Sequence, residues 1–119
     1  MPRPTKIKLH QKAKILEIHF EDGQQFQLSC EYLRVYSQSA EVTGHAPGQE
    51  VLQLGKEAVN IQAIIPVGNY GIRLEFDDGH DTGIYTWERL YTLGKHYGHY
   101  WNEYLKQLKA AGYGHKQDR

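Results

Sequence analysis

The sequence contains one short pattern twice, and this duplication constrains the fold more than any other feature. Phe20-Glu21-Asp22-Gly23 is answered by Phe76-Asp77-Asp78-Gly79, and each copy lies between stretches in which apolar and polar residues alternate. Alternation with a period of two is typical of half-buried strands, and Asp-Gly favours a type I′ hairpin turn. A residue that can cap a short helix follows each return strand, Ser29 and Thr86. We therefore predict two strand-turn-strand-helix units.

The stretch between the two units divides into a connection and a further strand. Residues 37–56 contain Pro47 and several glycines, which is typical of a turn-rich connection. Residues 59–67 are apolar and rich in β-branched side chains up to Pro66, so we expect a strand there, close to the centre of a sheet.

A helix is predicted at the C-terminal end, over residues 95–111. Its aromatic and aliphatic residues recur at i, i+4, i+7 and i+11, which makes one apolar stripe. We expect Trp101 to be buried against the sheet, His99 to face solvent, and Gly112 to end the helix. Residues 114–119 are polar and are expected to fray. The stripe consists of Tyr97, Trp101, Tyr104 and Leu108.

These patterns together predict an α+β fold in a single domain spanning residues 1–119. A small antiparallel or mixed sheet, built from the two units, should carry the C-terminal helix packed on one face.

Composition excludes several classes of function. Lys plus Arg and Asp plus Glu each number 14, so the net charge is zero, which argues against nucleic-acid binding. No apolar stretch is long enough to span a membrane, and the first ten residues lack the apolar centre of a signal peptide. Cys30 is the only cysteine, which excludes an internal disulfide and a multi-cysteine metal site. We expect a cytoplasmic protein.

No residue pattern points to an enzyme. Cys30 follows an apolar strand and is expected to be a buried, inert thiol. The serines lack a nucleophile-elbow context, and no phosphate-binding loop is present. His96, His99 and Glu103 share one helix face, which is expected to be solvated.

Oxygen and nitrogen ligands crowd one loop, from Asp77 to Asp81 with His80 between them. Such a cluster could hold a hard cation, although turn geometry alone explains the aspartates.

Two longer runs carry a resemblance to a known family. Residues 33–45 and 66–87 together resemble the gamma-butyrobetaine hydroxylase-like N-terminal domain, long catalogued as a domain of unknown function. The resemblance covers residues 5–93, the family core, and the C-terminal helix, rich in tyrosine and tryptophan, also suits the stand-alone bacterial members. The resemblance implies a domain that is fused elsewhere to 2-oxoglutarate-dependent hydroxylases and to P-loop ATPases carrying iron–sulfur clusters. In the hydroxylases it implies a structural zinc held by three cysteines and one histidine.

The zinc ligands of those relatives are not reproduced in this chain. Ser37, Ser39 and Val42 stand at the positions that match the cysteines, and only His80 matches the histidine. Neutral serine is a poor zinc ligand and valine is none, so we predict that the structural zinc is absent. Because the four ligands meet at one metal in the relatives, His80 should contact the turn of residues 37–42 through a hydrogen bond.

We therefore expect a non-enzymatic accessory domain without a cofactor. It would bind a protein partner, linked by the family fusions to iron–sulfur cluster carriers or 2-oxoglutarate oxygenases, and no nucleic acid or membrane. The alternative is a metal- or small-ligand-binding domain that uses His80 and His45 with Asp78 or Asp81. The candidate interaction residues are Arg34, Ser37, Ser39, Glu41, His45, Asn69, Tyr70, Asp78, His80, Asp81, Tyr85 and Trp87.

Overall fold

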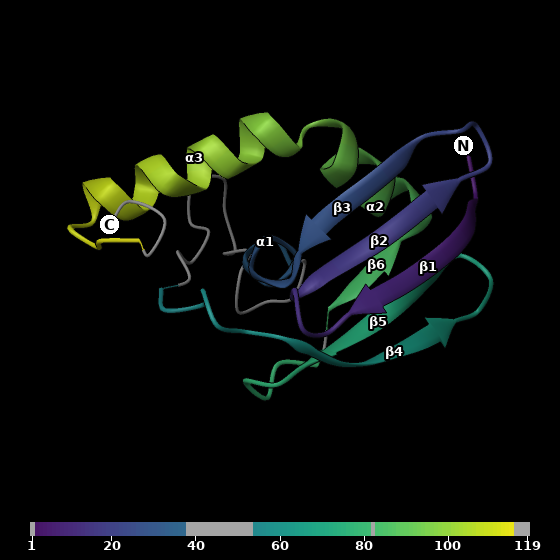
Figure 1. The fold of residues 1–119 in the computed structure, drawn as a ribbon, viewed down its shortest axis with the longest axis horizontal. Coiled ribbons are helices and arrows are strands. Elements are labelled where there is room, and N and C mark those ends of the chain that lie inside the picture. The colour runs from purple at the N-terminus through teal and green to yellow at the C-terminus, as the bar shows by residue number, and fades with distance from the viewer. Residues whose placement is uncertain (1, 38–53, 82, 116–119) are drawn as a thin grey trace.

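The computed structural model describes residues 2–37, 54–81 and 83–115, and its fold is α+β (Figure 1). None of its helices is long and apolar enough to cross a membrane, within the residues described. The elements are β1 (Pro4–His10), β2 (Ile15–Phe20), β3 (Gln25–Ser29), α1 (Cys30–Val35), β4 (Ile61–Val67), β5 (Gly71–Phe76), β6 (Ile84–Thr86), α2 (Trp87–Lys95) and α3 (Tyr97–Ala110).

The strands form two antiparallel sheets of three strands, in the orders β1-β2-β3 and β4-β5-β6. The two predicted units are present as β2-β3-α1 and β5-β6-α2, and each is preceded by one additional strand. The expectation that residues 59–67 lie near a sheet centre was wrong, because β4 is an edge strand. Pro66 within β4 has no N–H to donate, and an edge strand tolerates that loss.

The two hairpin turns have the same hydrogen bonds. In each turn the phenylalanine N–H donates to the carbonyl four residues later, at 2.8 Å for Phe20 and 2.9 Å for Phe76. The glycine N–H donates back to the phenylalanine carbonyl, and the glycine has a φ of +90° in the first turn and +89° in the second. The preceding aspartates do not have positive φ. The hairpins were predicted correctly, but the turn is type I followed by a glycine bulge rather than type I′.

Both predicted helix caps are confirmed. The Tyr32 N–H donates to Ser29 Oγ at the start of α1, and the Arg89 N–H donates to Thr86 Oγ1 at the start of α2, each at 3.1 Å. A side-chain oxygen thus satisfies one of the free N–H groups in each first turn.

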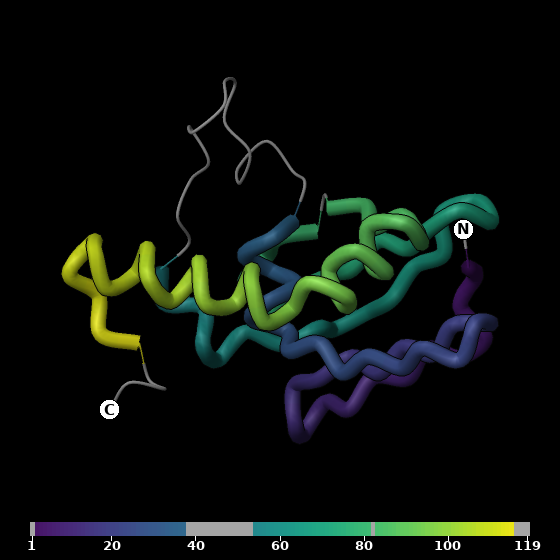
Figure 2. The backbone as a smooth tube through the Cα atoms, turned by 90° about the horizontal axis from the view of Figure 1, so that it is seen from above, coloured from purple at the N-terminus to yellow at the C-terminus, as the bar shows by residue number. Residues whose placement is uncertain are grey.

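The two sheets face each other and share one hydrophobic core (Figures 1 and 2). Helix α2 contacts both β3 and β6, so it closes one side between the sheets. Its Gly94 lies against the Phe26 ring of β3, where any larger side chain would collide. The fully buried core side chains include Leu16 and Ile18 from β2, Leu74 and Phe76 from β5, Tyr32 and Leu33 from α1, and Leu90 and Leu93 from α2.

Helix α3 packs on α1 through a second, smaller cluster that contains Val35, Tyr104 and Leu108. Trp101 is half-buried rather than buried as expected; its ring meets that of Tyr32 in α1, and it packs against both the larger core and the smaller cluster. His99 is exposed, as expected.

The chain end from residue 114 was expected to fray, but within it His115 is only 4 % exposed. His115 Nε2 lies 2.7 Å from Glu31 Oε2, an oxygen that also accepts from the Tyr104 hydroxyl at 2.8 Å. A positive φ of +78° at Gly112 turns the chain back toward α1 after α3 ends. Residues 116–119 lie outside the described part.

The Tyr104 hydroxyl provides the first test of this packing. Tyr104→Phe removes one of the donors to the buried Glu31 carboxylate, so we expect the free energy of unfolding to fall by about 1–2 kcal/mol. Tyr70→Phe is the matched control, because Tyr70 is 52 % exposed, and its effect should stay within about 0.5 kcal/mol. Denaturant titrations that give equal losses for the two variants would contradict the role of this hydrogen bond.

Candidate functional site

The two units meet where the end of α1 lies beside the hairpin between β5 and β6. Ser37 Oγ lies 2.9 Å from His80 Nε2, and the two residues are 1 % and 6 % exposed. The predicted hydrogen-bonded contact between His80 and the segment that begins at residue 37 is therefore confirmed. Ser39, Glu41, Val42 and His45 lie outside the described residues.

Hydrogen bonds and a glycine position the contact between Ser37 and His80. The N–H of His80 donates to Asp78 Oδ1 at 3.2 Å, and its carbonyl closes the hairpin. A side chain at position 83 would collide with Ser37 Oγ, so Gly83 permits the close approach of the two segments. The Tyr85 hydroxyl donates to the Leu33 carbonyl at 2.5 Å and ties β6 to α1.

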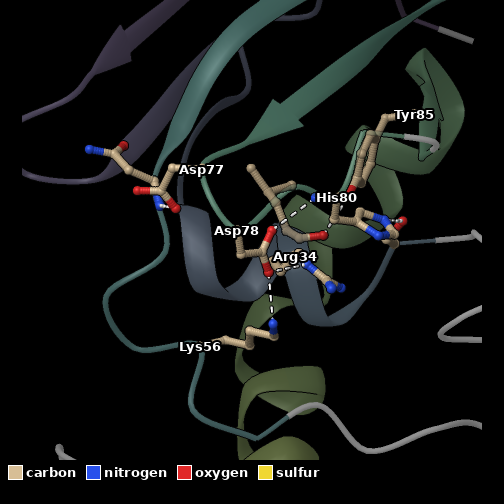
Figure 3. A network of polar contacts seen from close by, with 9 residues as sticks. Arg34, Lys56, Asp77, Asp78, His80 and Tyr85 are labelled. Atoms are coloured by element: carbon tan, nitrogen blue, oxygen red, sulfur yellow. Dashed lines mark hydrogen bonds and ion pairs between the residues drawn. The ribbon is translucent and has the colours of Figure 1, made fainter.

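Asp78 joins two cations from different parts of the chain (Figure 3). Its Oδ2 lies 2.9 Å from Arg34 Nε and 2.7 Å from Lys56 Nζ. Burial alone would raise the pKa of Asp78, but the hydrogen bonds from Lys56, from the His80 N–H and from Arg34 outweigh it and lower the pKa to about 2. Asp78 is therefore ionised at any physiological pH.

A serine hydrogen-bonded to a histidine is the pairing of an activated nucleophile and its base. Here the serine is 1 % exposed, so a substrate cannot approach its hydroxyl in this conformation. Burial raises the pKa of the Cys30 thiol to about 11, which keeps it protonated and unreactive at neutral pH. Neither group is suited to covalent catalysis.

The same residues do not fit the zinc that the resemblance implies. Zinc sites of this kind need deprotonated thiolates, whereas Ser37 offers a neutral hydroxyl that is bonded directly to His80. Asp78, the oxygen ligand of the alternative metal site, is engaged by Arg34 and Lys56. The described residues contain no group of three or more His, Cys, Asp or Glu side chains placed to hold a metal.

The other predicted site residues form an exposed group at the far end of β6. Tyr70 is 52 % exposed, and its carbonyl accepts from the Trp87 N–H at 3.0 Å. The Trp87 indole N–H donates to the Asn69 carbonyl at 2.9 Å, which fixes the orientation of the half-buried ring. We call Asn69, Tyr70 and Trp87 the aromatic surface. Asp81 is exposed and belongs to neither group.

Sequence reasoning missed two cations of the site. Lys56 lies in the connection that was read only as turn-rich, and Arg89 donates from Nη2 to the Tyr36 carbonyl at 3.0 Å. Both contacts join positions far apart in the chain, and a local sequence pattern does not predict such pairs.

A family model for the gamma-butyrobetaine hydroxylase-like N-terminal domain matches residues 7–91. The chain belongs to this family. The match spans both units and the whole polar site described above, and it ends within α2.

Solved structures support the same assignment. One NMR solution structure has 54 % identity and a TM-score of 0.81, covering 96 % of this chain and 85 % of the other. A second has 42 % identity and a TM-score of 0.82, covering 96 % and 90 %. A crystal structure of a DUF971-family protein of unknown function from Acidithiobacillus ferrooxidans has 35 % identity and a TM-score of 0.64, covering 77 % and 92 %. No curated protein matches the chain.

The serine at position 37 leads to a prediction about zinc. We expect purified protein to contain no stoichiometric zinc, and its melting temperature to be unchanged by a strong chelator, because a structural metal would contribute to the folding free energy. Elemental analysis and thermal denaturation measure the two quantities. One tightly bound equivalent of zinc would contradict the prediction.

The ion pairs of Asp78 predict a pH dependence. Because its pKa falls from the usual 3.8 to about 2 on folding, Asp78 stabilises the fold fully above about pH 4 and loses this contribution as the pH falls toward 2. Asp78→Asn should therefore lower the melting temperature at neutral pH, and the gap from wild type should narrow between pH 4 and pH 2. Asp81→Asn, at an exposed neighbour, is the control. A gap that stays constant over this range would show that the ion pairs do not act as described.

Proposed function

We propose that this protein is a non-enzymatic interaction domain that binds a protein partner through the aromatic surface. The observation that carries the proposal is the exposed Tyr70 ring, which projects from a backbone held by Trp87. Aromatic side chains dominate the energy of many interfaces, and a rigid anchor loses little conformational entropy on binding.

The family resemblance suggests the class of partner. Because related domains are fused to iron–sulfur carriers and to 2-oxoglutarate oxygenases, we propose that the partner is a cytoplasmic protein of one of these kinds. The alternative, a metal or small-ligand site at His80 and Asp78, has less support, since both side chains are engaged by groups of the chain itself.

Affinity capture tests this proposal. Tagged wild-type protein, Tyr70→Ser and Leu54→Ser are incubated with the native lysate, and the proteins that co-purify are identified by mass spectrometry. Leu54 is 49 % exposed and matches Tyr70 in exposure, but lies outside the aromatic surface. We expect a partner that wild type and Leu54→Ser retain and that Tyr70→Ser loses by about tenfold or more, the range of a single interface anchor. Retention by all three proteins would contradict the proposal.

A further inference from the structure

Two arginines beside the polar site have side-chain donors that find no acceptor. Arg34 Nη1 and Arg89 Nε are buried, and neither has a hydrogen-bond partner within the part of the chain that the structure describes. Arg34 Nε donates to Asp78, and Arg89 Nη2 donates to the Tyr36 carbonyl. A buried donor without an acceptor keeps its full cost of desolvation, so each is poised to gain a bond if an acceptor arrives.

The two unsatisfied donors belong to one region of the molecule. The positive charges of both Arg34 and Arg89 act on the Tyr85 hydroxyl, which burial otherwise makes harder to ionise by raising its pKa. Arg89 is bonded to the carbonyl of Tyr36, the residue that precedes Ser37. Both guanidinium groups therefore lie around the end of α1, next to the Ser37–His80 contact.

Among the residues that the structure describes, positive charge exceeds negative charge around this point. Asp78 is the carboxylate that pairs with Arg34 and Lys56 there, and Arg89 has no carboxylate partner in the same part of the chain. Asp77 points away from the cations in Figure 3 and accepts from the Asn60 N–H instead. Asp81 is exposed, and no ion pair joins it to these arginines in the described part of the chain.

We propose that Arg34 and Arg89 bind a carboxylate, the Asp or Glu side chain of the protein partner. This proposal rests on the proposed function, in which a protein partner binds the aromatic surface. It adds a second contact, a carboxylate of the same partner. A planar carboxylate matches the geometry of guanidinium donors and forms short charge-assisted bonds with them. The strand β6 connects this region to the aromatic surface, so one partner can contact both. Because Arg34 Nη1 and Arg89 Nε are buried, binding of the carboxylate requires a local rearrangement that exposes them.

Arg73 supplies a control within the same chain. Its Nε is also buried without a partner, but its side chain is 41 % exposed and its Nη2 lies 3.4 Å from Glu75 on the other side of β5. The Glu75 carboxylate and the exposure of the Arg73 side chain to solvent leave this guanidinium group with less to gain from the carboxylate of a partner.

Side-chain NMR of the full chain, labelled with ¹⁵N-arginine, tests the proposal in wild type without a variant that could unfold. The probes are sodium glutarate and a short acetylated peptide containing glutamate, with sodium chloride as the ionic-strength control. We expect saturable shifts of the Arg34 and Arg89 signals with both probes, with the peptide binding at least as tightly as glutarate. No saturable shift, or equal shifts at Arg73, would overturn the proposal. Tighter binding of glutarate would overturn it in favour of a free small acid.

Variants separate this proposal from the proposed function. Arg89→Gln keeps the Arg34–Asp78 ion pair and should weaken peptide binding about tenfold, which corresponds to one lost charge-assisted bond, while Arg73→Gln should not. In the capture experiment, Arg89→Gln should lose the partner that Arg73→Gln retains. A partner lost by Tyr70→Ser but fully retained by Arg89→Gln would overturn the carboxylate site and leave the interaction domain standing.

Discussion

The carboxylate of Asp78 joins the parts of the chain on which the rest of the structure depends. It accepts from Arg34 at the end of the first unit, from Lys56 in the connection, and from the His80 N–H within its own hairpin. A largely buried ion pair contributes little net stability when complete, but the loss of one partner leaves the other charge buried and unpaired, which destabilises the fold. Asp78 therefore joins the two units and the connection between them, beside the contact of Ser37 with His80.

Local patterns predicted the strands and helices of the two units, β4 and α3, because the causes of these elements are local, but β1 was not predicted. Alternation located the strands of both units, and Ser29 and Thr86 cap the helices as expected. The turn type was wrong because Asp-Gly suits two hairpin geometries, and only the φ of the aspartate separates them. The edge position of β4 and the ordered His115 depend on contacts between distant segments, which no window of sequence contains.

The candidate functional site was predicted only in part, and this part came from the family resemblance rather than from local sequence patterns. That Ser37 and His80 meet followed from the family resemblance, since nothing in either segment alone points to the other. Tyr70 was selected by residue type, whereas the hydrogen bonds from Trp87 to the Asn69 and Tyr70 carbonyls were not predicted. The unsatisfied donors of Arg34 and Arg89 had no signal in the sequence, because an arginine is expected to reach water. At the junction where the resemblance implies a zinc site in the hydroxylases, a hydrogen bond between Ser37 and His80 joins the two segments of this chain.

The hydrophobic interior is divided into two clusters, and this division determines which part of the protein can unfold locally. The larger cluster lies between the sheets, while Val35, Tyr104 and Leu108 form a separate cluster under α3. A segment with its own small cluster can detach while the rest stays folded. The first turns of α3 are attached to the larger cluster through Tyr97, Tyr100 and Trp101, whereas its C-terminal half rests on the smaller cluster and on the contact between His115 and Glu31. Backbone amides in the C-terminal half of α3 should therefore exchange with solvent deuterium sooner than those of β2 and β5, without the sheets separating.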